Sequence, residues 1–144
     1  MTSSQVERPL VSVVIPMFQS VEWIGATLAT VEAQTYPLLE TIVVDDGSTD
    51  QGSEVVAEFA SSCERPVRLV RTTNRGVAAA RNTGITESAG DFVALLDADD
   101  LWGPRKLELQ VARLGASGAP MCTCGYEFFD DRTGRRTGVV RVED

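Results

Sequence analysis

The amino-acid sequence predicts an α/β domain with a mostly parallel β-sheet that is covered by helices on both faces. Short runs of β-branched and other apolar residues alternate with segments of helical spacing along most of the chain. This alternation is typical of βαβ crossover units, in which a helix connects two parallel strands. The length of 144 residues and the apolar content of 43% fit a single globular domain.

The strands are predicted from short apolar runs. A run without polar alternation indicates a strand that is buried on both faces, as in a parallel sheet. Four such strands are expected at Leu10–Pro16, Glu40–Asp45, Val67–Val70 and Asp91–Leu96. A fifth strand and its hairpin partner are expected at Met121–Phe129 and Val139–Val142, joined by a turn at Asp130–Gly134.

The helices are predicted from apolar residues at helical spacing and from residues that favour helix ends. They are expected at Val21–Ala33, Ser53–Ser62, Val77–Glu87 and Arg105–Leu114. Tyr36-Pro37 ends the first helix. Ser48, Thr49 and Asp50 can each cap the second helix, and Pro104 suits the start of the fourth.

Charge and missing motifs exclude several classes of function. The net charge of −8, from 21 acidic and 13 basic residues, argues against nucleic acid as the main partner. It is compatible with a phosphate ligand that carboxylates bind through Mg²⁺ or Mn²⁺. The chain contains no histidine, which excludes Ser-His-Asp and Cys-His catalysis. The glycine-rich fingerprints of NAD and ATP sites do not occur either.

Cysteine usage and hydropathy predict the compartment. Cys63, Cys122 and Cys124 are an odd set without regular spacing, which indicates reduced thiols in a reducing compartment. No apolar run reaches the roughly 18 residues that a membrane span needs. Met1–Arg8 has no apolar stretch of signal-peptide type. We therefore expect a cytoplasmic protein, with a position at the inner face of the membrane as the alternative.

Acidic residues gather where the predicted strands end. Asp97 and Asp99 directly follow the strand Asp91–Leu96, and in an extended chain they point the same way. Ligands of open α/β sheets bind beyond the carboxyl ends of the strands. Two carboxylates on one side suit a hard divalent cation that also binds a diphosphate. The alternative is a solvated acidic turn that caps the next helix, and the buried strand before the motif favours the metal site.

Other residues near these strand ends have both a structural and a ligand-binding interpretation. Asp45 and Asp46 belong to a strand-to-helix turn, or one of the two carboxylates accepts a hydrogen bond from a base or ribose. Arg81 is a surface arginine, a partner of Asp46 or a donor to the nucleotide. Phe18 packs in the core or stacks on a base. Glu22 places a favourable charge in the first turn of a helix, and we include it among the predicted nucleotide-sugar contacts.

Four segments carry all of these residues except Glu22: Val13–Phe18, Val43–Asp50, Asn74–Gly84 and Leu96–Asp100. Their order and spacing strongly resemble those of family 2 glycosyltransferases, and the resemblance covers residues 10 to 129. It implies the GT-A fold, with a Rossmann-like, mostly parallel sheet. It also divides the chain into an N-terminal extension, residues 1–9, and a nucleotide-sugar-binding domain, residues 10–144, which ends before the acceptor-binding part.

The resemblance implies the nucleobase contacts. Phe18 and Asp46 would contact the base in a pocket that Pro16 shapes. Arg81 would lie against the base and against the loop that carries Asp46. The sequence departs from the family pattern at one position near this pocket: members of the family usually have asparagine where this chain has Gln19.

The resemblance also implies a metal and a reaction. Asp97 would bind the ribose or share the metal, and Asp99 would hold Mg²⁺ or Mn²⁺ on the diphosphate. The implied reaction is inverting transfer of a sugar from a nucleotide diphosphate sugar, commonly UDP-linked, to a hydroxyl group of the acceptor. A saccharide or lipid-linked acceptor in cell-surface polysaccharide or glycoconjugate synthesis is expected. The general base is expected beyond Asp144, so these 144 residues alone are not expected to complete catalysis.

Two alternatives to this enzyme remain open. The chain could be a non-catalytic nucleotide-binding or assembly domain. A nucleotidyltransferase is disfavoured because residues 16–20 contain no glycine-, lysine- or arginine-rich loop. An incomplete sheet exposes an apolar edge or face, so a homo-oligomer is a further expectation.

Overall fold

The computed structural model describes residues 8–142 of the chain. The chain divides into two compact units, residues 1–106 and residues 107–144. The first unit contains the predicted parallel sheet, and the second contains most of one helix and a hairpin. Within the described residues, no helix has the length and apolar composition that crossing a bilayer requires. The predicted boundary at residues 9 and 10 stays a prediction, and seven residues of the predicted extension lie outside the described range.

The sheet of the first unit has four parallel strands in the order β3-β2-β1-β4. Their bounds are β1 Val11–Met17, β2 Leu39–Asp45, β3 Val67–Arg71 and β4 Phe92–Leu95. The register pairs Val11 with Leu39 of β2 and with Phe92 of β4. All seven residues of β1 are buried, as expected for a central strand in a sheet that is covered on both faces.

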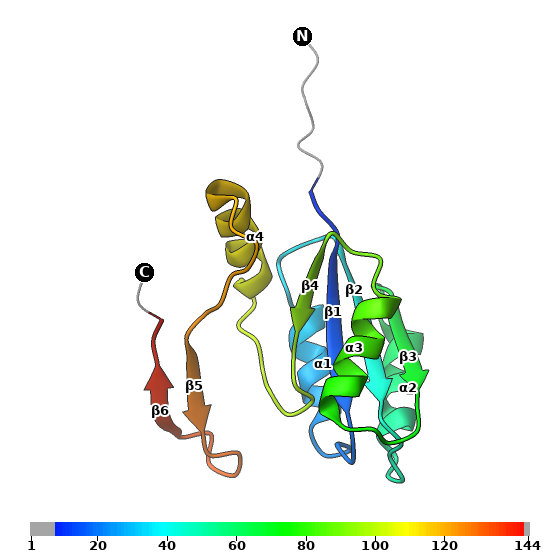
Figure 1. Ribbon diagram of the computed structural model, residues 1–144. Coiled ribbons are helices and arrows are strands. Elements are labelled where there is room, and N and C mark those ends of the chain that lie inside the picture. The colour runs from blue at the N-terminus through cyan, green and yellow to red at the C-terminus, as the bar shows by residue number, and fades with distance from the viewer. Residues whose placement is uncertain (1–7, 143–144) are drawn as a thin grey trace. The chain divides into compact units, whose positions relative to one another are not determined.

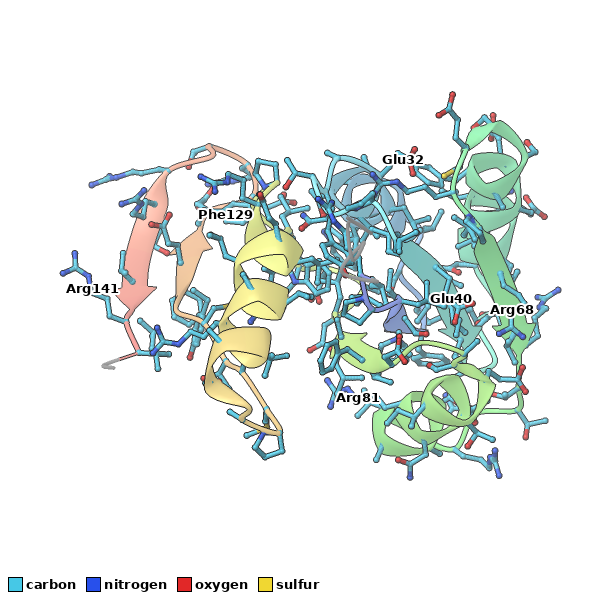
Figure 2. The ribbon with its side chains drawn as sticks, turned by 90° about the horizontal axis from the view of Figure 1, so that it is seen from above. Glu32, Glu40, Arg68, Arg81, Phe129 and Arg141 are labelled. Atoms are coloured by element: carbon cyan, nitrogen blue, oxygen red, sulfur yellow. The ribbon has the colours of Figure 1, made fainter. Side chains whose placement is uncertain are left out.

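Helices cover both faces of this sheet (Figures 1 and 2), which confirms the predicted fold class. Helices α1 (Ile24–Glu32) and α2 (Gly52–Ser62) lie on one face, and α3 (Val77–Glu87) lies on the other. The bounds of α3 are those that the sequence predicts. This helix packs closely on the sheet, where Ala80 joins a buried cluster with Ile42 and Val44.

One predicted helix start is wrong, and the start of α2 differs from the prediction by one residue. The predicted helix from Val21 begins only at Ile24, because residues 21–23 form a turn. Helix α2 begins at Gly52 with Gln51 at the N-cap position, and no side chain caps its first turn from there. Of the three residues predicted to cap this helix, Asp50 does contact its start: it accepts hydrogen bonds from the backbone N–H groups of Gly52 and Val21, at 3.0 Å and 2.9 Å. Its carboxylate therefore joins two loops in addition to serving the helix start.

The second unit contains most of α4 (Lys106–Ser117) and the antiparallel strands β5 (Tyr126–Phe129) and β6 (Arg136–Val140). The predicted hairpin is confirmed, but its first strand begins five residues later than expected. The rings of Tyr126 and Phe128 meet edge to face, with centroids 5.4 Å apart. All three cysteines of the chain are free thiols.

Candidate functional site

A pocket of about 300 Å³ lies at the carboxyl end of β1 and β2. Its walls come from the end of β1, the turn after β2 and the start of α3, and its lining residues are Pro16, Met17, Phe18, Asp46, Asn74, Gly76, Val77 and Ala80. Phe18 and Asp46, which are predicted to contact a nucleobase, and Pro16, which is predicted to shape their pocket, thus line one pocket. Phe18 is 50% exposed, so much of its side chain is open to solvent rather than buried in the core.

The carboxylate of Asp46 organises the pocket. This residue is only 3% exposed. Its Oδ1 accepts hydrogen bonds from the backbone N–H of Arg75 at 3.0 Å and from the hydroxyl of Thr72 at 3.2 Å. Its Oδ2 accepts one from the backbone N–H of Gly76 at 2.7 Å. The buried charge is therefore balanced by donors from the loop before α3, and that loop is held against the end of β2.

A glycine permits the tight passage after Asp46. Gly47 has a φ of +80°, which side-chain-bearing residues rarely adopt. A Cβ atom there would lie 2.9 Å from the backbone nitrogen of Asn74. The turn after β2 and the loop before α3 can therefore approach each other only with glycine at this position.

Asp45, the neighbour of Asp46, has a structural role. Its carboxylate is 1% exposed and accepts hydrogen bonds from the Ser48 backbone and the Ser53 hydroxyl. Burial raises the pKa of Asp45, but the hydrogen bonds from Ser48 and Ser53 and the charge of Arg71 outweigh it, so the pKa lies below its ordinary value. The charged form is therefore preferred in the folded chain, and Asp45 fixes the start of α2 rather than a ligand.

Arg81 pairs with Asp97. Its Nη2 lies 2.5 Å from Oδ1 of Asp97, and the two side chains are 34% and 47% exposed. The suggested pairing with Asp46 is therefore wrong, because the donors at Asp46 come from the loop before α3. The Nε of Arg81 is buried and has no hydrogen-bond partner within the described part of the chain. Arg81 thus links α3 to the residue that follows the buried Leu96.

The loop after β4 presents three carboxylates. Asp99 is exposed and has no hydrogen-bond or ion-pair partner among residues 8–142. Burial raises the pKa of Asp100, and the charges of Asp99 and Asp97 raise it further. Mutual repulsion of this kind is relieved by a cation. The described residues do not, however, bring three metal-binding side chains together in a group that could hold a metal ion.

The donor set nevertheless fits a metal that shares its ligands with a substrate. Mg²⁺ is commonly held by one or two protein carboxylates together with water and substrate phosphates. Asp97 and Asp99 supply oxygen ligands of this type at the end of β4, which pairs with β1. One oxygen of Asp97 is already bonded to Arg81. The fit is therefore to a site completed by a diphosphate, not to a closed protein cage.

Glu22 is not brought into the pocket. It is exposed in the turn before α1, whose first turn carries no acidic residue. The predicted position in the first helical turn is therefore wrong. Its role as a nucleotide-sugar contact stays a prediction, because Glu22 does not belong to the lining of the pocket.

Sequence reasoning missed the residues of α1 that hold the acidic loop. Thr27 is fully buried and donates a hydrogen bond of 2.8 Å to the carbonyl of Ala98, between Asp97 and Asp99. One helical turn on, the hydroxyl of Thr30 accepts the Trp102 N–H at 3.2 Å. The signal was available in the sequence, because polar side chains at positions 27, 30 and 34 recur on one face of a helix.

Thr27→Val tests this support. Valine keeps the shape of threonine but removes the hydroxyl, so the buried carbonyl of Ala98 loses this donor. We expect the free energy of unfolding to fall by about 1–3 kcal/mol in urea denaturation. Thr27→Ser retains the hydroxyl and is expected to keep the hydrogen bond. Equal stability of Thr27→Val and the unchanged chain would show that this hydrogen bond does not hold the loop.

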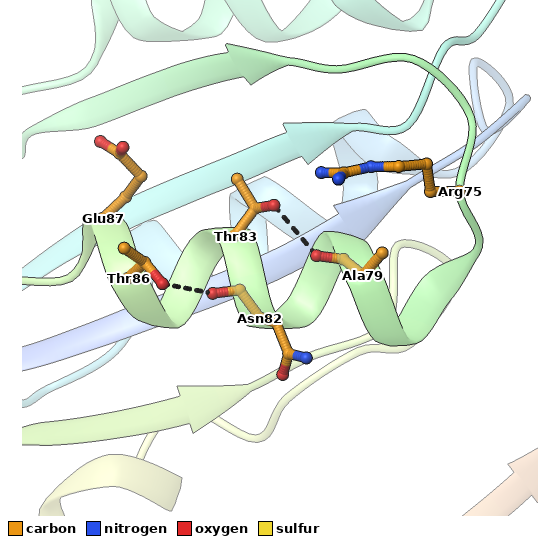
Figure 3. Close-up of a pocket in the computed structure, with 6 residues that line it drawn as sticks. All are labelled: Arg75, Ala79, Asn82, Thr83, Thr86 and Glu87. Carbon is orange, nitrogen blue, oxygen red and sulfur yellow. Dashed lines mark hydrogen bonds between the residues drawn. The ribbon is translucent and has the colours of Figure 1, made fainter.

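A second pocket, of about 350 Å³, lies on the surface of α3 (Figure 3). Its lining residues are Arg75, Ala79, Asn82, Thr83, Thr86 and Glu87. The hydroxyls of Thr83 and Thr86 donate to the carbonyls of Ala79 and Asn82, both at 3.0 Å, so they are satisfied within the helix. None of the predicted site residues lines this pocket, and we assign it no role.

Comparison with known proteins establishes the family. Residues 12–141 match the model of glycosyl transferase family 2. The chain belongs to glycosyltransferase family 2. Its sheet and helices are those of the GT-A fold, as in the solved structures described below.

The chain is similar to one relative and two solved structures whose names state a substrate or a bound ligand. The chain is 34% identical to the Escherichia coli UDP-Glc:alpha-D-GlcNAc-diphosphoundecaprenol beta-1,3-glucosyltransferase WfgD over 124 residues, covering 86% of this chain and 48% of that protein. The mannosyltransferase PcManGT from Pyrobaculum calidifontis, solved with GDP-Man and Mn²⁺, has a TM-score of 0.71 and 35% identity over 76% of this chain and 33% of its own. S. aureus TarS 1-349 in complex with UDP-GlcNAc has a TM-score of 0.71 and 27% identity, with coverages of 76% and 32%. This family 2 chain therefore spans about half of the relative and a third of each structure.

Proposed function

We propose that this chain binds the donor of a metal-dependent, inverting glycosyltransferase that uses a nucleoside diphosphate sugar. The observation that carries the proposal is the pocket shared by Pro16, Phe18 and Asp46, together with Asp97 and Asp99 at the end of β4. Since β4 pairs directly with β1, the carboxylates follow the strand next to the one that ends in the pocket. This arrangement suits a ligand with a base at one end and a diphosphate at the other.

The base occupies the pocket. Phe18 offers half of its surface for stacking, and the buried carboxylate of Asp46 sits in the lining as a hydrogen-bond acceptor. A carboxylate accepts hydrogen bonds from the N–H groups of a base or the hydroxyls of a ribose. We propose UDP as the nucleotide, because a structural neighbour is solved with UDP-GlcNAc, although another is solved with GDP-Man.

Asp97 and Asp99 are proposed to hold Mg²⁺ or Mn²⁺ against the diphosphate. When bound, the cation offsets the negative charge of the leaving nucleoside diphosphate. Arg81 donates to one oxygen of Asp97 and so restrains that carboxylate, while the other oxygen is proposed to face the cation. A neighbour solved with Mn²⁺ supports the choice of cation.

Transfer to an acceptor is proposed for the whole protein rather than for these 144 residues. The proposed acceptor is a hydroxyl of a saccharide or a lipid-linked sugar, in line with the diphosphoundecaprenol acceptor named for the E. coli relative. The general base and the acceptor site are proposed to lie outside this chain. A cytoplasmic location, at the inner face of the membrane, agrees with such an acceptor and also stays a proposal.

Asp99→Ala tests the metal-dependent part of this function. Calorimetric titration with UDP in Mn²⁺ is expected to show the binding free energy reduced by about 2–5 kcal/mol, because an oxygen ligand facing a cation and a diphosphate is lost. The same variant is expected to bind UDP no better with Mn²⁺ than with EDTA.

Asp131→Ala is the matched control, because Asp131 is exposed in the turn of the hairpin and far in sequence from the pocket. It is expected to bind UDP and Mn²⁺ like the unchanged chain. Failure of the unchanged chain to bind UDP or GDP with either metal would overturn the proposed function.

A further inference from the structure

Gln19 joins two loops beside the pocket. It follows Phe18 at the end of β1, and its side chain reaches the loop between β2 and α2. We propose that Gln19 is a positioning residue that sets the shape of the nucleobase pocket, an inference that rests on the proposed function. Gln19 itself does not line the pocket, so it acts through the residues beside it.

Several hydrogen bonds tie Gln19 to the neighbouring loop. Its Oε1 accepts from the backbone N–H groups of Thr49 and Asp50, at 2.8 Å and 3.1 Å. Its Nε2 donates to the Thr49 hydroxyl at 3.0 Å, and its backbone N–H donates to the Ser48 hydroxyl at 3.0 Å. A further hydrogen bond joins the same two loops: the backbone N–H of Val21 donates to the carboxylate of Asp50 at 2.9 Å.

The backbone of Gln19 is held in an unfavourable conformation. Its φ is +50°, and no other non-glycine residue among those described has a positive φ. Glutamine is not among the residues that favour this left-handed region, so the surrounding structure must stabilise it. The hydrogen bonds to Ser48, Thr49 and Asp50 supply that stabilisation. They hold the sharp turn that follows directly after Phe18.

The two sides of this connection both lead into the pocket. Phe18 precedes Gln19 directly, and its carbonyl also accepts the Ser20 hydroxyl at 3.0 Å. Asp46 lies two residues before Ser48, on the loop that Gln19 binds. Loss of the Gln19 amide therefore frees the loops that carry both proposed base-contacting side chains. The acidic loop after β4 is tied to α1 by separate hydrogen bonds and is not affected.

The expected result is a selective loss of nucleoside binding. Gln19→Ala is expected to weaken UDP binding in Mn²⁺ by about tenfold in calorimetry. Binding of inorganic pyrophosphate in Mn²⁺ should stay within about twofold of the unchanged chain, because it engages only the cation proposed to be held by the carboxylates of the acidic loop. Hydrogen exchange at the amides of Thr49 and Asp50 should become faster.

Two further variants make the result decisive. Gln19→Gly removes the amide but adopts a positive φ without strain, so it should fold at least as well as Gln19→Ala and still lose UDP affinity. Gln51→Ala is the control, because Gln51 is exposed in the same loop and its side chain makes no cap hydrogen bond.

Three outcomes would overturn the inference. Unchanged UDP affinity in both Gln19 variants contradicts it directly. An equal loss of UDP and pyrophosphate binding also contradicts it, because the effect would then not be specific to the nucleoside. If the unchanged chain binds pyrophosphate but not UDP, the proposed function itself fails, and the role of Gln19 fails with it.

Discussion

Asp46→Ala is expected to lower the free energy of unfolding by about 2–4 kcal/mol and to abolish UDP binding. The carboxylate is 3% exposed and accepts the backbone N–H groups of Arg75 and Gly76. Without it, these two donors lose their acceptor at the end of β2. The loop before α3 is then no longer held beside the pocket, so stability and ligand binding fall together.

Urea denaturation and calorimetry with UDP measure the two effects. Asp46→Asn should be intermediate in stability, because an amide retains one oxygen acceptor but turns a donor toward the second N–H. Asp131→Ala should change neither quantity. An Asp46→Ala variant within about 0.5 kcal/mol of the unchanged chain would show that the carboxylate does not hold the loop.

Gly84→Ala should produce the second large effect, a loss of folding stability. Gly84 lies in α3 where the helix packs on β1, and a Cβ atom there would come 2.3 Å from Cγ1 of Val14. Val14 is fully buried, so it has no free space to move into. Overpacking of this kind costs about 1–3 kcal/mol, whereas alanine in place of glycine gains up to about 1 kcal/mol in a helix interior. We therefore expect a net decrease in the free energy of unfolding.

Gly25→Ala provides the matched control for this substitution. Gly25 lies in α1, and a Cβ atom there would be 3.6 Å from Val55, which is ordinary van der Waals contact. It should leave stability unchanged or raise it slightly. Thermal denaturation of both variants measures the difference, and a Gly84→Ala variant at least as stable as Gly25→Ala would contradict the close packing of α3 on the sheet.

The sheet and α3 could be predicted because their sequence signals are local and agree with each other. A strand with one face in solvent would alternate apolar and polar residues, but Ser12 is the one polar residue in the run Leu10–Pro16. The structure accordingly buries all of β1. In α3, small residues such as Ala80 and Gly84 permit close packing on the sheet. The order of four motifs then indicated the family, which the family match confirms.

The remaining details depend on contacts between distant segments. Residues 21–23 form a turn, and the Val21 N–H donates to Asp50 in a distant loop, a contact that no local pattern reveals. Arg81 pairs with Asp97 rather than Asp46 because backbone donors already satisfy Asp46. The polar face that carries Thr27 is visible in the sequence, but its acceptor, the carbonyl of Ala98, lies in a distant segment.

Nuclear magnetic resonance of the ¹⁵N-labelled chain tests the central claim, that donor binds at the carboxyl end of this parallel sheet. Addition of UDP with Mg²⁺ should shift the amide signals of Phe18, Gly76 and Val77. Replacement of Mg²⁺ by paramagnetic Mn²⁺ should broaden the signals of residues 97–100 most strongly. Perturbation centred instead on Thr83 and Thr86, which line the pocket in Figure 3, or no perturbation at all, would contradict the account.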